Sequence, residues 1–151
     1  SKQGRFEKAK DLFTIVLKAE QDNFSARLEL ARCFILQKKY HLAIKQLKYM
    51  IDIGADFSDV FLELATAYMG KGFYDEAEQV LNRVIEKDSE YFSAFYQRAI
   101  LHAIQNRPEK AVKDLKIAQK LDFEGVLSEL VRHERAFLII KDDFLYKKIT
   151  N

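Results

Sequence analysis

One interval between alanines constrains the fold of this chain more than any other feature. The alanines of a first column are each separated by 34 residues: Ala9, Ala43, Ala77 and Ala111. A second column has the same spacing: Ala31, Ala65 and Ala99. A larger side chain at a close helix–helix contact typically costs about 1–3 kcal/mol, so each alanine marks a contact repeated in every unit. A period of about 20–50 residues is typical of stacked repeats, and the sequence therefore predicts an all-α solenoid.

Three full units follow from these columns, each with two helices joined by a short turn. The predicted helices cover residues 25–37 and 40–53, 58–71 and 74–87, and 93–105 and 108–121. Within the first helix of a unit, Leu30 and Phe34 recur as Leu64 and Tyr68, spaced i and i+4 on one helical face. The pattern is that of helices packed along one apolar stripe.

Capping and turn residues mark the ends of these helices. Three equivalent residues are predicted N-caps of the first helices: Ser25, Asp59 and Ser93. A left-handed turn is predicted between the paired helices at four equivalent positions: Gly4, Lys38, Gly72 and Asn106. Pro108 stands in the first turn of its helix, where a missing N–H is tolerated.

The third unit resembles the tetratricopeptide repeat family. Its residues 64–68 (LATAY) and 72–77 (GFYDEA) match the family's leucine, small, tyrosine, glycine, tyrosine and alanine positions. The resemblance implies a right-handed superhelical solenoid of antiparallel helix pairs, with about three and a half repeats plus a C-terminal capping helix. It predicts a single domain, 1–151, in these segments: 1–23, 24–57, 58–91, 92–125 and 126–151.

Three departures from the family pattern accompany the resemblance. The family's proline is replaced in every unit, by Gln21, Ala55, Ser89 and Phe123. In the fourth unit Arg98 and His102 replace the usual leucine and tyrosine, which predicts a looser interface. The first unit starts at its turn and lacks its first helix, so its apolar stripe is predicted to be uncovered. We interpret the chain as a fragment of a longer protein; the alternative is pairing of this stripe with a second copy.

The 34-residue period ends after Gly125. A further helix is predicted from an apolar stripe that runs from Leu127 to Leu138, and Asp142 or Asp143 is predicted to cap a last short turn. A solenoid needs a terminal helix with a polar outer side, and we assign that role to this segment. The alternative is a tail, residues 137–149, that docks into a partner or into the array's own groove.

Composition and residue spacing argue against several functions. A formal net charge of +2 gives little attraction for nucleic acid, and no apolar run is long enough for membrane insertion. Aromatic residues that could stack bases are predicted to close repeat junctions instead: Phe24, Phe57, Phe92 and Phe123. The histidines lack metal-ligand spacing, His102 falls on a packing face, and Cys33 occupies a small, buried position. We therefore expect no catalytic residue, metal or cofactor, and the lone cysteine favours a reducing compartment such as the cytoplasm.

The resemblance also implies a binding surface. In such arrays the first helices of the repeats line a concave groove, and the corresponding residues here are Ser25, Leu28, Glu29, Arg32, Asp59, Leu62, Glu63, Thr66, Met69, Ser93, Tyr96, Gln97, Ile100 and Ile104. Family members that clamp the acidic C-termini of chaperones use basic residues on these columns. Only Arg32 is basic here, so clamp-type binding is disfavoured.

These features predict a protein–protein interaction scaffold or adaptor that is not an enzyme. A peptide or partner helix with apolar anchors, and with a basic residue facing Glu29 or Glu63, is the expected ligand. Two alternatives stay open: self-assembly into a homo-oligomer through the terminal helices, and a regulatory docking domain attached to an enzyme outside this segment.

Overall fold

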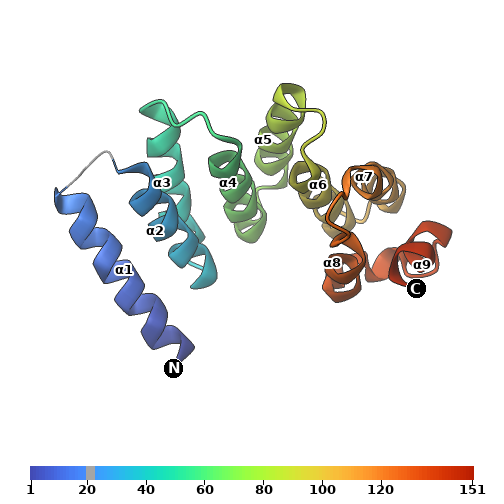
Figure 1. Cartoon of the computed structure of the whole chain (residues 1–151), viewed down its shortest axis with the longest axis horizontal. Coiled ribbons are helices and arrows are strands. Elements are labelled where there is room, and N and C mark those ends of the chain that lie inside the picture. Colours follow the sequence, from blue (N-terminus) through green and yellow to red (C-terminus); the bar gives the residue numbers. More distant parts are fainter. Residues whose placement is uncertain (20–22) are drawn as a thin grey trace. The chain divides into compact units, whose positions relative to one another are not determined.

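The computed structural model describes residues 1–19 and 23–151, so the proline-equivalent Gln21 lies outside the described residues. Every regular element in these ranges is helical (Figure 1). In chain order the elements are α1 (Lys2–Ala19), α2 (Phe24–Leu36), α3 (Tyr40–Asp52), α4 (Ser58–Lys71), α5 (Tyr74–Lys87), α6 (Phe92–Ile104), α7 (Pro108–Leu121), α8 (Leu127–His133), the 3₁₀ helix η1 (Arg135–Ile140) and α9 (Phe144–Thr150). The predicted all-α class is confirmed. None of the described helices has the length and apolar character needed to cross a membrane.

The chain divides into two compact parts, Ser1–Val80 and Leu81–Asn151, with the boundary inside α5. From here on we call these parts the first unit and the second unit, and we call each 34-residue segment a repeat. In the first unit α2 packs against α1, α3 and α4, and α3 packs against α4. The alanines of both columns account for this close packing, because Ala31 and Ala43 are completely buried. Leu47 and Met50, at core positions of α3, are also buried. By contrast Ala9, the equivalent of Ala43 in α1, is only half-buried.

The turns between paired helices adopt the predicted left-handed backbone. Gly72 has φ 83°, and Lys38 and Asn106 have φ 58° and 57°. In all three turns the next residue donates its N–H to the carbonyl five residues earlier, at 2.8 Å, which closes the C-terminus of the preceding helix. The prediction for Gly4 is wrong, because Gly4 lies inside α1.

The predicted N-caps are also wrong. The residues before α2, α4 and α6 are Asn23, Phe57 and Tyr91, so the predicted serine and aspartate caps lie inside the first turn. Asn23 accepts a hydrogen bond from the N–H of Ala26 at 2.9 Å, whereas Phe57 and Tyr91 make no side-chain cap. Phe57 instead meets Phe24 edge-on, with ring centroids 6.2 Å apart. The residue that precedes α4 is therefore in an aromatic contact and makes no capping hydrogen bond.

The second unit is built on α6 and α7, and the C-terminal segment packs on both. The predicted terminal helix is broken: α8 ends before Glu134, whose extended backbone (ψ 109°) leads into η1. The Glu134 carboxylate accepts a hydrogen bond from the N–H of Ala136 at 3.1 Å and so caps the new turn. Because of this break Phe137 is completely buried, whereas Leu138 stays 57% exposed. Asp143 caps α9 through the N–H of Leu145 at 2.7 Å, as predicted.

Candidate functional site

The side chains predicted to bind a partner lie partly on a surface of the first unit where α2 and α4 contact each other. We call this surface the α2/α4 face, and it comprises Ser25, Leu28, Glu29, Arg32, Asp59, Glu63, Thr66 and Met69. At its centre the Arg32 guanidinium donates to both neighbouring carboxylates, with Nη1 2.5 Å from Glu29 and Nε 2.7 Å from Glu63. The hydrogen bond to Glu63 is the main cause that raises the pKa of Arg32. The structure thus joins three predicted site residues in one charged network.

Exposure differs among the other predicted residues of this unit. Ser25 and Asp59 are exposed, whereas Leu28 and Met69 are half-buried. Leu62 is only 8% exposed, so it offers little surface to a ligand. Its carbonyl accepts a hydrogen bond from the Thr66 hydroxyl at 3.0 Å. The usable part of the face therefore consists of polar residues with half-buried apolar side chains beside them.

In the second unit the predicted residues lie on α6, and the C-terminal segment covers the central one. Tyr96 stacks on Phe92, with ring centroids 6.1 Å apart, and meets Phe137 edge-on at 6.0 Å. Its hydroxyl donates to the carbonyl of Leu130 at 3.3 Å. Burial, together with the negative charge of Glu134, raises the pKa of Tyr96 to about 12. Tyr96 is therefore a packing residue as well as a predicted groove residue.

The remaining α6 residues are more varied. Ile100 packs against the core of the second unit, and Ile104 is 44% exposed. The side-chain oxygen of Gln97 is buried without a hydrogen-bond partner in the described part of the chain. Ser93 lies at the start of α6, where it lines a pocket. These residues do not form one continuous exposed surface.

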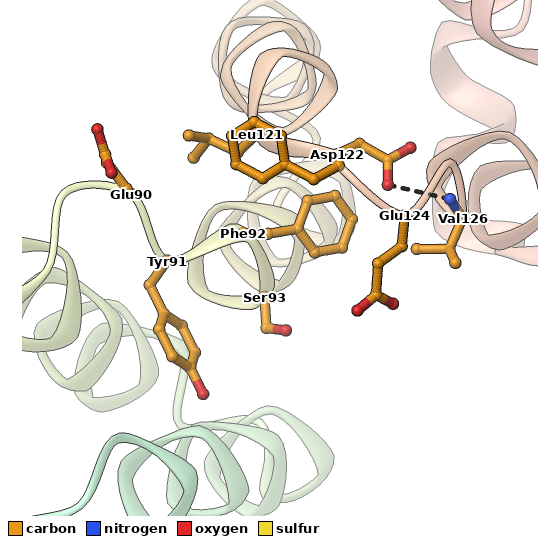
Figure 2. Close-up of a pocket in the computed structure, with 9 residues that line it drawn as sticks. Glu90, Tyr91, Phe92, Ser93, Leu121, Asp122, Glu124 and Val126 are labelled. Carbon is orange, nitrogen blue, oxygen red and sulfur yellow. Dashed lines mark hydrogen bonds between the residues drawn. The ribbon is translucent and has the colours of Figure 1, made fainter.

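That pocket has a volume of about 320 Å³ and belongs entirely to the second unit (Figure 2). Its walls come from the start of α6 and from the connection between α7 and α8: Glu90, Tyr91, Phe92, Ser93, Leu121, Asp122, Phe123, Glu124 and Val126. We call it the α6–α8 pocket. Figure 2 shows the Phe92 ring directed toward Asp122 and Glu124, while Tyr91 points away from them.

The sequence assigned only Ser93 of these residues to a site. Phe123 was expected to close a repeat junction, but it is 88% exposed. The reason is that α7 ends at Leu121, and the chain then turns toward α8 instead of starting another repeat. An aromatic residue at the end of the last full repeat, with no next repeat to cover it, was the available signal, and the 34-residue pattern led it to be interpreted as a junction residue.

Groups capable of chemistry are placed as structural residues. Cys33 is 7% exposed and burial raises the pKa of its thiol, which disfavours the nucleophilic thiolate. His102 is 4% exposed, with Nε2 3.5 Å from the Asp114 carboxylate. Across residues 1–19 and 23–151, no three His, Cys, Asp or Glu side chains are grouped so that they could hold a metal ion.

Arg98 of α6 and Asp114 of α7 form an ion pair in the second unit. The guanidinium is bidentate, with Nε and Nη2 each 2.8 Å from an Asp114 oxygen, and Nη1 donates to Asn82 at 2.8 Å. Asp114 is 2% exposed. Arg98, which stands where the family usually has leucine, was expected to loosen this interface. In the structure it makes a specific polar contact between α6 and α7, which pack closely.

Comparison with known protein families gives matches to the tetratricopeptide repeat family. Two family models, both described as tetratricopeptide repeat, match residues 1–56 and 34–100, and together they span residues 1–100. No curated protein matches the chain.

Solved structures share the fold over nearly the whole chain. A crystal structure of MamA is 19% identical, with a TM-score of 0.72 over 98% of this chain and 84% of that one. TTC0263, a thermophilic TPR protein of Thermus thermophilus, is 23% identical, with a TM-score of 0.72 over 97% and 82%. YrrB, described as a TPR protein with an unusual peptide-binding site, is 16% identical, with a TM-score of 0.67 over 97% and 79%. At these identities the likeness establishes the solenoid fold.

Proposed function

Because this chain belongs to the tetratricopeptide repeat family, we propose that it is a protein-binding module that holds a peptide or partner helix on its α2/α4 face. The face is the part of the predicted groove where side chains of two successive first helices meet. The observation that carries the proposal is the network in which Arg32 of α2 joins Glu29 of α2 to Glu63 of α4. This network gives the face a fixed charge pattern beside apolar side chains.

Charge selects the kind of partner. Three carboxylates, of Glu29, Asp59 and Glu63, stand against the single guanidinium of Arg32, so the face has a formal charge of −2. An acidic C-terminus would meet this negative surface and find its only cation already paired. A partner with apolar anchors for Leu28 and Met69 and with a basic flank fits better, since opposite charge favours encounter and register. Clamp-type chaperone binding stays disfavoured.

A comparison of baits tests the proposal. The variant S25R/D59R changes two exposed positions of the face by three charge units, and H41R/D52R makes the same change at exposed positions of α3. Each bait, with circular dichroism equal to wild type, is used for a pull-down from source-cell lysate with quantitative mass spectrometry. With S25R/D59R, recovery of the partner should fall at least about tenfold, which is the size of effect expected at an interface hot spot. With H41R/D52R, recovery should stay at the wild-type level.

The binary interaction of purified partner and purified chain is then measured by calorimetry. Binding that is weakened by S25R/D59R and kept by H41R/D52R supports the face. Equal binding by all three baits refutes it, because two added arginines cannot be accommodated inside a contact without a change in affinity.

A second candidate function is self-assembly through α1. Leu12 and Ile15 are 63% and 61% exposed, and Val16 is 38% exposed, which leaves an apolar stripe of the kind that associates. Sedimentation velocity over about a hundredfold range of concentration tests this, because a dimer forms by mass action. A dimer that is lost in L12K/I15K supports assembly, and a strict monomer at every concentration excludes it.

A further inference from the structure

The α6–α8 pocket is lined by residues of the second unit alone, and none of them belongs to the α2/α4 face. We propose that it binds an arginine side chain of a partner protein. The proposal rests on the charge and the aromatic content of the pocket walls, and it goes beyond the function proposed above.

The charge of the walls selects a cation. Three of the nine lining residues are carboxylates, Glu90, Asp122 and Glu124, and none is basic. Asp122 is fixed in place, because its two oxygens accept the N–H groups of Val126 and Leu127 at 3.0 and 2.9 Å. The start of α6 also faces the pocket, but a helix N-terminus carries only about half a positive charge. Three negative charges outweigh it, so an anionic occupant is disfavoured.

Aromatic surface selects arginine over lysine. Phe123 is 88% exposed, and the Phe92 ring is directed toward Asp122 and Glu124 (Figure 2). A guanidinium is flat and weakly hydrated, so it stacks on a ring while its edge donates to carboxylates. A lysine ammonium is a compact, strongly hydrated charge and uses a ring less well. Leu121 and Val126 extend the wall with apolar surface for the arginine stem.

The same chain shows this combination of groups inside its own fold. Arg98 is bidentate to Asp114 and its guanidinium carbon lies 5.5 Å from the centroid of the Phe95 ring. Arg27 lies over the Tyr49 ring at 4.2 Å and donates to Gln46 at 2.6 Å. Within its own fold this protein therefore binds guanidinium groups between an aromatic ring and a side-chain oxygen. The walls of the α6–α8 pocket present the same two kinds of group to a ligand.

A matched pair of probes tests the proposal. The ligand is acetyl-Leu-Arg-Leu-amide, and its control is acetyl-Leu-citrulline-Leu-amide, which has the same shape without the charge. Each is titrated into the ¹⁵N-labelled full chain and followed by chemical shifts. We expect shifts confined to residues 90–93 and 121–126, an affinity for the arginine peptide at least about fivefold higher than for the citrulline peptide, and a loss of that preference as salt is raised.

Variants separate the pocket from general surface charge. E90Q/E124Q and F123A should each weaken the arginine peptide by about fivefold or more. The controls E86Q/E109Q and F144A change two exposed glutamates and an exposed phenylalanine outside the pocket, and binding should be unchanged. Equal shifts with citrulline, shifts outside the pocket, or none at about 10 mM peptide, a concentration at which even weak contacts are visible, would overturn the proposal. Because S25R/D59R leaves these residues intact, failure here and failure at the α2/α4 face are distinguishable.

Discussion

The buried Arg98–Asp114 pair allows a quantitative test of how one repeat position is used. Subtracting one period of 34 residues places Leu64 at the position of Arg98 and Val80 at that of Asp114. In the first unit Leu64 is 4% exposed and Val80 packs against the same apolar cluster. In the second unit the pair is ionic, with two N–O distances of 2.8 Å and an almost inaccessible carboxylate. The variant R98L/D114V therefore transplants an apolar pair that the chain already uses.

The structure predicts opposite effects for the single and the double substitution. R98L leaves the Asp114 carboxylate buried without its guanidinium, and breaking a buried pair in this way costs about 3–5 kcal/mol. Replacing both partners with packed apolar residues is often neutral or stabilising, by about 1–4 kcal/mol. We expect R98L to lose about 3–5 kcal/mol of unfolding free energy, which is a large part of a typical total of about 5–15 kcal/mol. R98L/D114V removes the buried carboxylate and should recover most of that loss, less the contacts that His102 makes with Asp114 and Asn82 makes with Arg98 in the wild type.

Urea unfolding, followed by circular dichroism, measures these differences on the full chain, and hydrogen exchange of amides in α6 and α7 locates them in the second unit. D114V completes the double-mutant cycle, which isolates the coupling between the two side chains. The reasoning is refuted if R98L costs less than about 1 kcal/mol, the level of an exposed ion pair. It is refuted equally if R98L/D114V is no more stable than R98L.

Three further predictions follow from local geometry. K38G relieves a left-handed backbone that a side chain makes unfavourable by about 1–2 kcal/mol, so its urea midpoint should rise; an unchanged or lower midpoint would contradict this. A Cβ at Gly70 would collide with the Tyr40 ring, so G70A should cost about 1–3 kcal/mol of unfolding free energy through overpacking, and less when Y40L is also present. Tyr96 keeps its proton to a pKa of about 12, whereas an unfolded tyrosine ionises near pH 10. The unfolded chain therefore loses a proton first, and wild type should lose more stability than Y96F as the pH rises from about 10 to 12; parallel curves would argue against it.

Much of the fold was predictable because the same close contacts between helices recur every 34 residues along the sequence. Interactions within one repeat and with the next repeat determine the alanine contacts and the pairing of helices. They also determine the left-handed turns at Lys38, Gly72 and Asn106, so all these features recur at the same spacing. The family was recognisable for the same reason. Local signals failed at the helix starts: the residue before α4 is Phe57, which makes no side-chain cap and instead meets Phe24 with ring centroids 6.2 Å apart.

The candidate sites were less predictable because they depend on what covers each position. The period could identify Leu62 and Tyr96 as equivalent, but it could not show that Leu62 is 8% exposed or that Phe137 lies against Tyr96. Nor could it place Phe123 in a pocket wall, since the 34-residue period ends after Gly125 and no next repeat covers this residue. The 34-residue period predicts which side chains occupy equivalent positions in successive repeats, but it does not predict how exposed each of them is.

Energetics decide whether the C-terminal segment could move aside to free Tyr96 for a ligand. The segment contributes five side chains that are no more than 6% exposed: Leu127, Val131, Phe137, Ile140 and Ile149. Burial of such a side chain is worth about 1.5–3 kcal/mol relative to leaving it exposed, so lifting the segment would expose five core side chains of the second unit to water. A ligand that needs the segment open must supply the difference in affinity between the open and the closed state. The segment is therefore part of the folded core, and a charged residue at Tyr96 would perturb folding before it reported on binding. Partner contacts of the second unit must use what stays exposed, which includes Ile104 and the walls of the α6–α8 pocket.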